Sequence, residues 1–151
     1  MKSTNQASIC NNMPIIRIAP VCNGKIYVVP RLAADGKSLR LDLPIEESVE
    51  HVSTKSDKAA CKVKEKYHLH LHTEASPRFC VQHKSESNKS IVFLYVLPLK
   101  KEEEISFCEG TFITAEDIFT YPERYNSNLQ LESELLGMAA ELWNDFYTLD
   151  S

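Results

Sequence analysis

Three histidines at alternate positions are the first residues whose type and spacing could do chemistry. They lie in the segment KVKEKYHLHLHTE (residues 62–74) as His68, His70 and His72. Two histidines two residues apart on a strand can share a zinc ion, but zinc needs a third ligand and usually a fourth. The available candidates are Cys61, Cys80 and His83, and no spacing selects among them. A helix end that runs into a strand with one polar side explains the alternation without a metal, and we expect that arrangement.

The lysines in the same segment form a second candidate site. Lys62, Lys64 and Lys66 surround Glu65, and Lys58 comes one helical turn earlier. Residues 62, 65 and 66 share one face of a helix. Such a face could pair with phosphate groups as point charges, whereas it would repel a divalent cation. The alternative is a solvated face whose lysine–glutamate pairs serve only the stability of the helix.

Composition and charge narrow the function classes. The 151 residues fit one domain, and a hydrophobic share of 43% with a charged share of 25% is typical of a soluble globular protein. The net charge of −4 gives no reason to expect nucleic acid as a partner. No apolar run approaches the length of a membrane span. The first residues, MKSTNQASICNN, contain no apolar stretch, so we do not expect a secretory signal or a membrane partner.

The five cysteines are scattered and contain no C-x-x-C pair. An odd, unclustered set of this kind predicts reduced thiols and a cytoplasmic location. Residues 1–12 are polar and aperiodic, so we expect a flexible N-terminal tail followed by a single domain over residues 13–151. Nothing in the sequence fixes an oligomeric state.

The elements that must position these residues can be predicted from periodicity and turn residues. Two β-rich runs, 14–21 and 25–32, are separated by Asn23-Gly24, a strong signal for a tight turn. We expect a short strand at 39–44 and a surface loop at 45–57. A helix follows from about residue 55 to 67, capped by Thr54 with Asp57 three residues later. Its buried side is expected at Ala59, Ala60, Val63 and Tyr67.

The second half of the chain contains further strand-like segments and two helices. Residues 69–74, 78–83 and 90–99 read as extended, and the last two are expected to be joined through the polar tip KSESNK. ISFCEGTFI is strand-like, Thr114 can cap a short helix AEDIF, and Ser127 opens a long final helix. This order predicts an α+β domain with a mixed β-sheet flanked by helices. The helix stripe expected to face the core comprises Leu131, Leu135, Met138, Leu142 and Phe146.

In this order of elements the chain resembles a Nudix-fold domain. NGKIYVVPR resembles the second strand of that family and ends in the basic residue Arg31. LDLP resembles the strand that runs into the family's Pro-Gly-Gly corner, and EGTFITAEDI resembles the late strand and short helix. AACKVKEKYHL resembles the helix written A-x-R-E-U-x-E-E-x-G-U. The resemblance covers residues 14–147 and implies a Nudix-like α/β/α sandwich.

The helix departs from the family pattern where that pattern supplies metal ligands. With Glu65 on the first Glu of the E-E pair, two glutamate positions become Lys62 and Lys66. The Arg and Gly positions become Cys61 and His68. Upstream, Ile45 and Glu46 stand where two glycines belong, and Ser53 stands where the isolated Glu belongs.

The resemblance implies two functions. In the family, glutamates of this helix hold divalent cations that bridge a diphosphate. Hydrolysis by this chain would therefore need Mg²⁺ or Mn²⁺ at Glu65 as the catalytic and metal-binding residue, with Glu46 and Glu47 as helpers.

Because most of the carboxylates are replaced, we expect instead a protein that binds a phosphate-bearing, nucleotide-like small molecule without standard metal-dependent hydrolysis and without a required cofactor. Arg31, Lys62 and Lys66 would face the phosphates, and Tyr95 or Tyr121 could stack on the ligand. An active hydrolase of a nucleoside diphosphate derivative with a rearranged carboxylate set stays open, as does a purely structural or interaction role.

Overall fold

The computed structural model describes residues 13–33, 35–50, 58–86 and 89–150, with side chains to residue 144. The tail expected at 1–12, the cap expected at Thr54 and Asp57, Ser53 and the side chain of Phe146 lie outside the described residues.

Within the described residues, seven strands form one mixed sheet, whose main path runs β3-β2-β1-β6-β5. The central strands β1 (Ile15–Cys22) and β6 (Ile91–Pro98) pair in parallel. β2 (Lys25–Leu32), β3 (Leu39–Asp42) and β5 (Arg78–Lys84) add antiparallel pairs on either side. β4 (Ile45–Ser48) pairs with the first half of β1, and β7 (Thr111–Ile113) pairs with β2.

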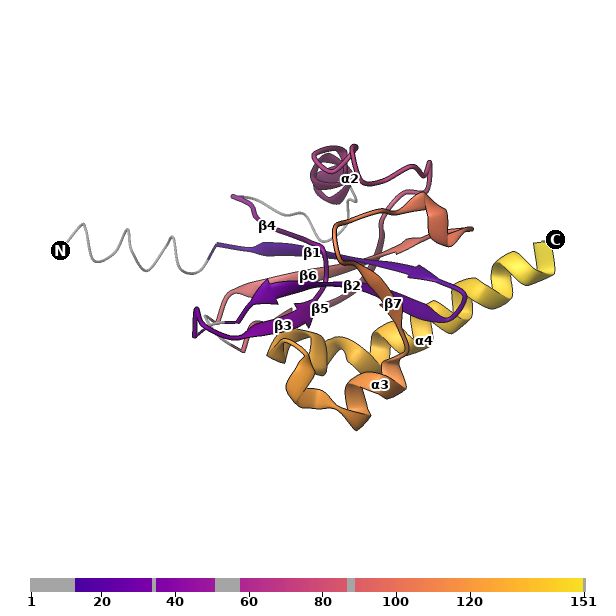
Figure 1. The fold of residues 1–151 in the computed structure, drawn as a ribbon. Helices are drawn as coiled ribbons and strands as arrows, with labels where there is room; N and C mark the ends of the chain where they lie inside the picture. The colour runs from indigo at the N-terminus through magenta and orange to yellow at the C-terminus, as the bar shows by residue number, and fades with distance from the viewer. Residues whose placement is uncertain (1–12, 34, 51–57, 87–88, 151) are drawn as a thin grey trace.

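Helices cover both faces of this sheet (Figure 1). α2 (Lys58–Glu65) lies over one face, and α3 (Ala115–Thr120) and α4 (Ser127–Asp150) lie over the other. Two 3₁₀ turns, η1 (Glu102–Glu104) and η2 (Pro122–Arg124), belong to the connections. The expected mixed sheet between helices is confirmed. Among the described helices, none is both long and apolar enough to cross a membrane.

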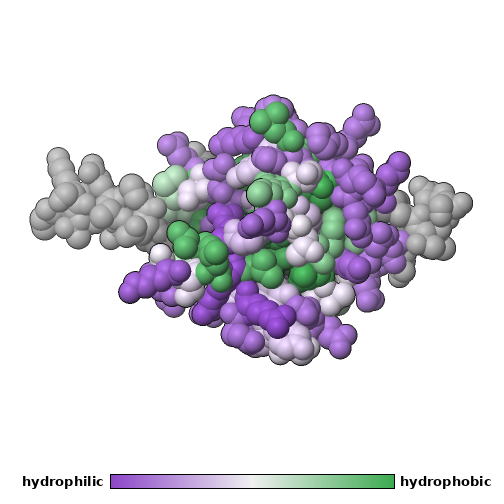
Figure 2. All heavy atoms as spheres, viewed as in Figure 1, coloured by the Kyte–Doolittle hydropathy of each residue, from purple (hydrophilic) through white to green (hydrophobic). Residues whose placement is uncertain are grey.

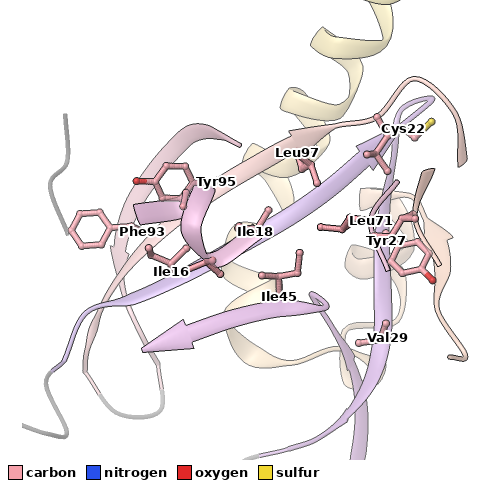
Figure 3. Close-up of a cluster of buried hydrophobic side chains, with 14 residues drawn as sticks. Ile16, Ile18, Cys22, Tyr27, Val29, Ile45, Leu71, Phe93, Tyr95 and Leu97 are labelled. Carbon is pink, nitrogen blue, oxygen red and sulfur yellow. The ribbon is translucent and has the colours of Figure 1, made fainter. Parts of the chain in front are cut away.

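Strand alternation divides the core into two layers. In β2, Tyr27 and Val29 belong to the cluster beneath α2, whereas Ile26 and Val28 belong to the cluster beneath α3 and α4. Figure 3 shows the first cluster, in which side chains from several strands converge. Because both faces are covered, the central strands are apolar at nearly every position instead of alternating.

The predicted turn between β1 and β2 and the predicted cap of α3 are both present in the structure. Asn23 and Gly24 both adopt positive φ, 54° and 75°, as a tight turn between β1 and β2 requires. Thr114 caps α3, because its Oγ1 accepts a hydrogen bond of 3.2 Å from the backbone N–H of Asp117. The antiparallel pairing of β5 with β6 also agrees with the prediction.

The prediction of a surface loop from residue 45 was wrong for its first four residues. Ile45–Ser48 forms β4, and its register with β1 places Ile45 opposite Ile18. Ile45 is fully buried. Because two glutamates, Glu46 and Glu47, follow Ile45, a prediction based on hydrophobicity did not identify this short strand.

The segment LHLHTE was also predicted wrongly, because the chain continues in turns after α2. The backbone N–H of His70 donates to the carbonyl of Tyr67 at 2.9 Å, and the N–H of Leu71 donates to the same carbonyl at 3.1 Å. Leu69 is 74% exposed, and only Leu71 forms a β-bridge, with Ile105. The alternating histidines therefore do not mark a strand with a polar side.

The apolar stripe predicted for the core side of α4 is wrong as well. Leu131, Leu135, Met138 and Leu142 are exposed. The buried side of the helix contains Leu129, Glu132, Ser133, Leu136 and Ala140. Glu132 turns inward because it pairs with a buried arginine of β1, described below, and this pair fixes the rotation of the helix.

Candidate functional site

Helix α2 presents a basic outer face. Ala60 and Val63 are buried against the sheet, as predicted, whereas Lys62, Glu65 and Lys66 are exposed. Figure 2 shows that hydrophilic residues cover most of the α2 layer. Lys62 lies in the last turn of α2 and Lys66 directly follows its last residue, so the two are about one turn apart.

Lys66 belongs to a small polar cluster between α2 and β4, the β4–α2 cluster, which consists of Arg31, Glu47, Lys66 and Tyr67. The Lys66 Nζ lies 3.9 Å from Glu47 Oε2, and the Tyr67 hydroxyl lies 3.5 Å from Glu47 Oε1. Arg31 is half-buried at the end of β2, and its Nη1 donates to the carbonyl of Leu43 at 3.2 Å. Of the three predicted phosphate-facing cations, Lys66 contacts Glu47, Arg31 acts electrostatically on the neighbouring Tyr67, and Lys62 lies about one helical turn before Lys66.

The pKa of Tyr67 records the electrostatics of this cluster. Burial raises the pKa of its hydroxyl, and the neighbouring carboxylate of Glu47 raises it further. Arg31 acts in the opposite direction. Tyr67 is therefore a neutral hydrogen-bond donor beside Lys66, and Arg31 acts on it as a positive charge.

Glu65 shares a helix face with Lys62 but, unlike Lys62 and Lys66, it also borders a cavity. It borders a cavity of about 360 Å³ together with Cys61, Lys64, His68, Leu71, Thr73, Ser76 and Pro77. The Lys64 ammonium donates to the carbonyls of Thr73 and Ala75, at 3.1 Å and 2.5 Å, and so closes one side of the cavity.

The two helper carboxylates, Glu46 and Glu47, point to opposite faces of the sheet. They are neighbours on β4, and strand geometry sends successive side chains to opposite sides. Glu46 accepts a hydrogen bond of 2.6 Å from Arg17 on the α4 side, while Glu47 faces Lys66 and Tyr67. Each carboxylate already has a cationic partner, and the pair does not converge on Glu65.

These residues do not fit a site for Mg²⁺ or Mn²⁺, which requires several converging oxygen ligands. Within the described part of the chain, no group of three or more His, Cys, Asp or Glu side chains is placed to hold a metal ion. The histidines considered as zinc ligands contact different residues and do not converge. The ring of His70 stacks on Phe107 at 4.3 Å between centroids, and His83 Nε2 lies 2.7 Å from Glu132.

Neither of the two tyrosines considered as stacking partners is placed to stack on a ligand at the β4–α2 cluster. Tyr95 is fully buried within the core layer beneath α2, where Figure 3 shows it. Tyr121 is 41% exposed at the end of α3, and the Arg124 guanidinium lies over its ring, 4.1 Å from the centroid. Burial prevents the first from stacking on a ligand, and the second belongs to the other face of the sheet.

Sequence reasoning missed a buried ionic network, the Arg17 network, which consists of Arg17, Asp42, Glu46, His83 and Glu132. Arg17 is completely buried, and its guanidinium contacts all three carboxylates, at distances of 2.6 to 3.3 Å. The hydrogen bond to Glu132 raises the pKa of His83. The signal that could have found it is a charged residue in the middle of the apolar strand IIRIAPV, because a buried charge needs a partner.

A second, more open cavity lies at the other end of β2. Its volume is about 560 Å³. It is bordered by Lys25, Tyr27, Glu102, Glu103, Ile105, Ser106, Phe107, Gly110, Thr111 and Phe112. The Tyr27 hydroxyl accepts a hydrogen bond of 3.0 Å from the backbone N–H of Phe107 and thereby holds this loop against β2.

Comparison with known proteins supports the fold through structure. No model of a known protein family matches the sequence, and no curated protein matches it. The structure is similar to DR0079 from Deinococcus radiodurans, with a TM-score of 0.57, 14% identity and 82% of each chain covered.

Two further similar structures are hydrolases of the NUDIX family. The one from Nitrosomonas europaea has a TM-score of 0.51 at 12% identity and covers 84% of this chain and 88% of its own. The one from Clostridium perfringens has a TM-score of 0.51 at 12% identity and covers 85% of this chain and 98% of its own. The mixed sheet between helices, together with these matches, establishes that the chain has a Nudix-like fold.

Proposed function

We propose that this protein binds a phosphate-bearing, nucleotide-like small molecule and does not hydrolyse it by the metal-dependent route. The observation that carries the proposal is the position of the cations. In the β4–α2 cluster Lys66 contacts Glu47 and Arg31 acts electrostatically on Tyr67, and Lys62 extends the positive charge along α2. Guanidinium and ammonium groups pair directly with phosphate oxygens, so this side of the helix can hold a phosphate without a bridging metal.

The distribution of charge on α2 and beyond supports binding over hydrolysis. Residues 58–66 contain four lysines and one glutamate. Glu47, a carboxylate of β4, contacts both Lys66 and Tyr67. An incoming phosphate could replace Glu47 as the partner of Lys66, because the Lys66 side chain is 62% exposed and its contact with Glu47 is long, at 3.9 Å. Such an exchange costs little, since exposed ion pairs contribute about 0–1 kcal/mol.

The test combines binding and turnover on one panel of ligands. ADP-ribose, dinucleotides and nucleoside triphosphates are each added to the full chain with Mg²⁺, with Mn²⁺, or with EDTA. Thermal unfolding reports binding, and release of product reports hydrolysis. We expect at least one ligand to raise the melting temperature in EDTA, with no turnover in any condition.

Variants connect the result to the cations. Lys62→Glu with Lys66→Glu should abolish the stabilisation by ligand. The matched control, Lys37→Glu with Lys89→Glu, changes the net charge equally at exposed turn residues and should preserve the stabilisation. Turnover that is abolished by Glu65→Gln would instead establish an active hydrolase. A panel without any stabilisation would leave an interaction role.

A further inference from the structure

The outer side of α4 exposes a continuous apolar seam. Leu131, Leu135, Met138 and Leu142 are 52%, 41%, 65% and 66% exposed. These four residues are called the α4 seam. They lie on the opposite side of the helix from Leu129, Leu136 and Ala140, which are buried against the sheet. The seam therefore contributes nothing to the core of this fold.

The spacing of the seam is that of a helix-pairing surface. Successive members are separated by four, three and four residues, which is the a/d pattern of a heptad repeat. In this register Leu135 and Leu142 occupy a positions, and Leu131 and Met138 occupy d positions. Such a seam accepts side chains of a second helix between its own, whereas scattered exposed leucines do not.

The size of the seam suits one helix. Four side chains at these exposures present apolar surface on the order of a few hundred Å², the scale of the largest apolar patch on a typical monomer, which is often functional. A stable complex of two globular proteins buries roughly 800 Å² on each partner. The seam alone is too small for that, but it matches the contact that one amphipathic helix makes.

The charge around the seam selects the partner. Residues 111–151 contain eight acidic residues and a single basic residue, Arg124, and α4 contains no lysine, arginine or histidine. Glu134 and Glu141 are exposed and directly precede Leu135 and Leu142, at the g positions that flank the seam. A second copy of α4 would offer these glutamates no basic partner, which disfavours self-pairing relative to a basic helix. Lysine or arginine on a partner helix would form ion pairs with Glu134 and Glu141.

We propose that the α4 seam is a docking site for a partner helix that has apolar a and d positions flanked by lysine or arginine. The apolar side chains supply the contact, and the acidic residues of α4 supply the choice of a basic partner and its orientation. This site lies on the opposite face of the sheet from the β4–α2 cluster and is independent of the ligand proposed there.

The test uses two synthetic helical peptides of equal length with leucine at every a and d position. One carries lysine at the e and g positions, and the other carries glutamate. Fluorescence anisotropy of each labelled peptide is measured against the full chain. We expect the lysine peptide to bind in the micromolar range, more weakly as salt rises, and the glutamate peptide not to bind.

Variants distinguish the seam from non-specific attraction. Leu135→Gln with Met138→Gln should weaken binding of the lysine peptide at least tenfold, whereas Leu32→Gln with Leu39→Gln, at two other exposed leucines, should not change it. Glu134→Lys with Glu141→Lys should reverse the preference toward the glutamate peptide. Equal binding of both peptides, binding insensitive to the seam variant, no binding, or a dimer of the chain that the seam variant dissolves would each overturn the proposal.

Discussion

Replacement of Arg17 by methionine should be among the most damaging single changes in this protein. Methionine keeps an unbranched chain in the strand but removes the guanidinium that contacts Asp42, Glu46 and Glu132. Asp42 and Glu132 are only 4% and 1% exposed, so water cannot take over as their partner. Breaking a buried charge pair by removal of one partner costs about 3–5 kcal/mol. For a chain of this size, that loss lowers the melting temperature by roughly 6–20 °C.

Urea denaturation followed by circular dichroism measures the loss directly. The midpoint should fall while the slope of free energy against urea stays unchanged, because the surface exposed on unfolding is the same. A second variant separates the charge effect from packing. Combining Arg17→Met with Asp42→Leu and Glu132→Leu removes the stranded carboxylates and should recover most of the lost stability. A single variant that loses less than about 1 kcal/mol, or a triple variant that is no more stable than the single one, would refute this reasoning.

Three further predictions concern stability. The hydrogen bond to Glu132 raises the pKa of His83, so the stabilisation by protonated His83 is complete below its unfolded pKa of about 6.5 and is lost as pH rises through the higher folded pKa. The difference in free energy of unfolding between wild type and His83→Gln should therefore shrink as pH rises above about 6.5, and a constant difference would contradict the assignment. Gly110→Ala should cost about 1–3 kcal/mol in urea denaturation because the new Cβ overlaps the ring and hydroxyl of Tyr27; an unchanged midpoint would show that the ring moves freely. Asn126→Ala should cost about 1 kcal/mol by removing the side-chain oxygen that caps α4, whereas Asn126→Asp, which keeps an oxygen, should not.

Local sequence signals predicted those parts of the fold that local chemistry determines. The turn at Asn23 and Gly24 needs only positive φ, and the cap at Thr114 needs only a hydroxyl beside free N–H groups. The parallel pairing of β1 with β6 and the position of β4 depend on residues far apart in the chain, and hydrophobicity alone does not report them.

The rotation of α4 shows why the rest could not be predicted. The helix carries two apolar stripes, and the one with the larger side chains, from Leu131 to Leu142, was the natural choice for the core. The structure buries the other stripe because Glu132 must reach Arg17, 115 positions away in the sequence. Hydrophobic periodicity does not report a buried ion pair, so it could not show that this pair, and not the four larger apolar residues, decides which side of α4 is buried.

For the candidate site, too, the sequence indicated some residues but not how all of them are arranged. Lys62 and Lys66 are exposed, as their spacing indicated, whereas Lys64 is half-buried, and Arg31 acts electrostatically on Tyr67 beside Lys66. The separation of Glu46 from Glu47 follows from the strand that the sequence concealed. Residue types therefore indicated the cations of the β4–α2 cluster, whereas the placement of the carboxylates required the sheet.

Isothermal titration calorimetry of the full chain with ADP-ribose and the other phosphate ligands, performed in EDTA, tests the central claim most directly. We predict binding to at least one of them without any divalent ion, weakened at least tenfold by Lys62→Glu with Lys66→Glu and unaffected by Glu65→Gln. Binding that requires Mg²⁺ or Mn²⁺, is lost in Glu65→Gln and is followed by cleavage of the ligand would contradict the claim, as would the absence of binding to every ligand.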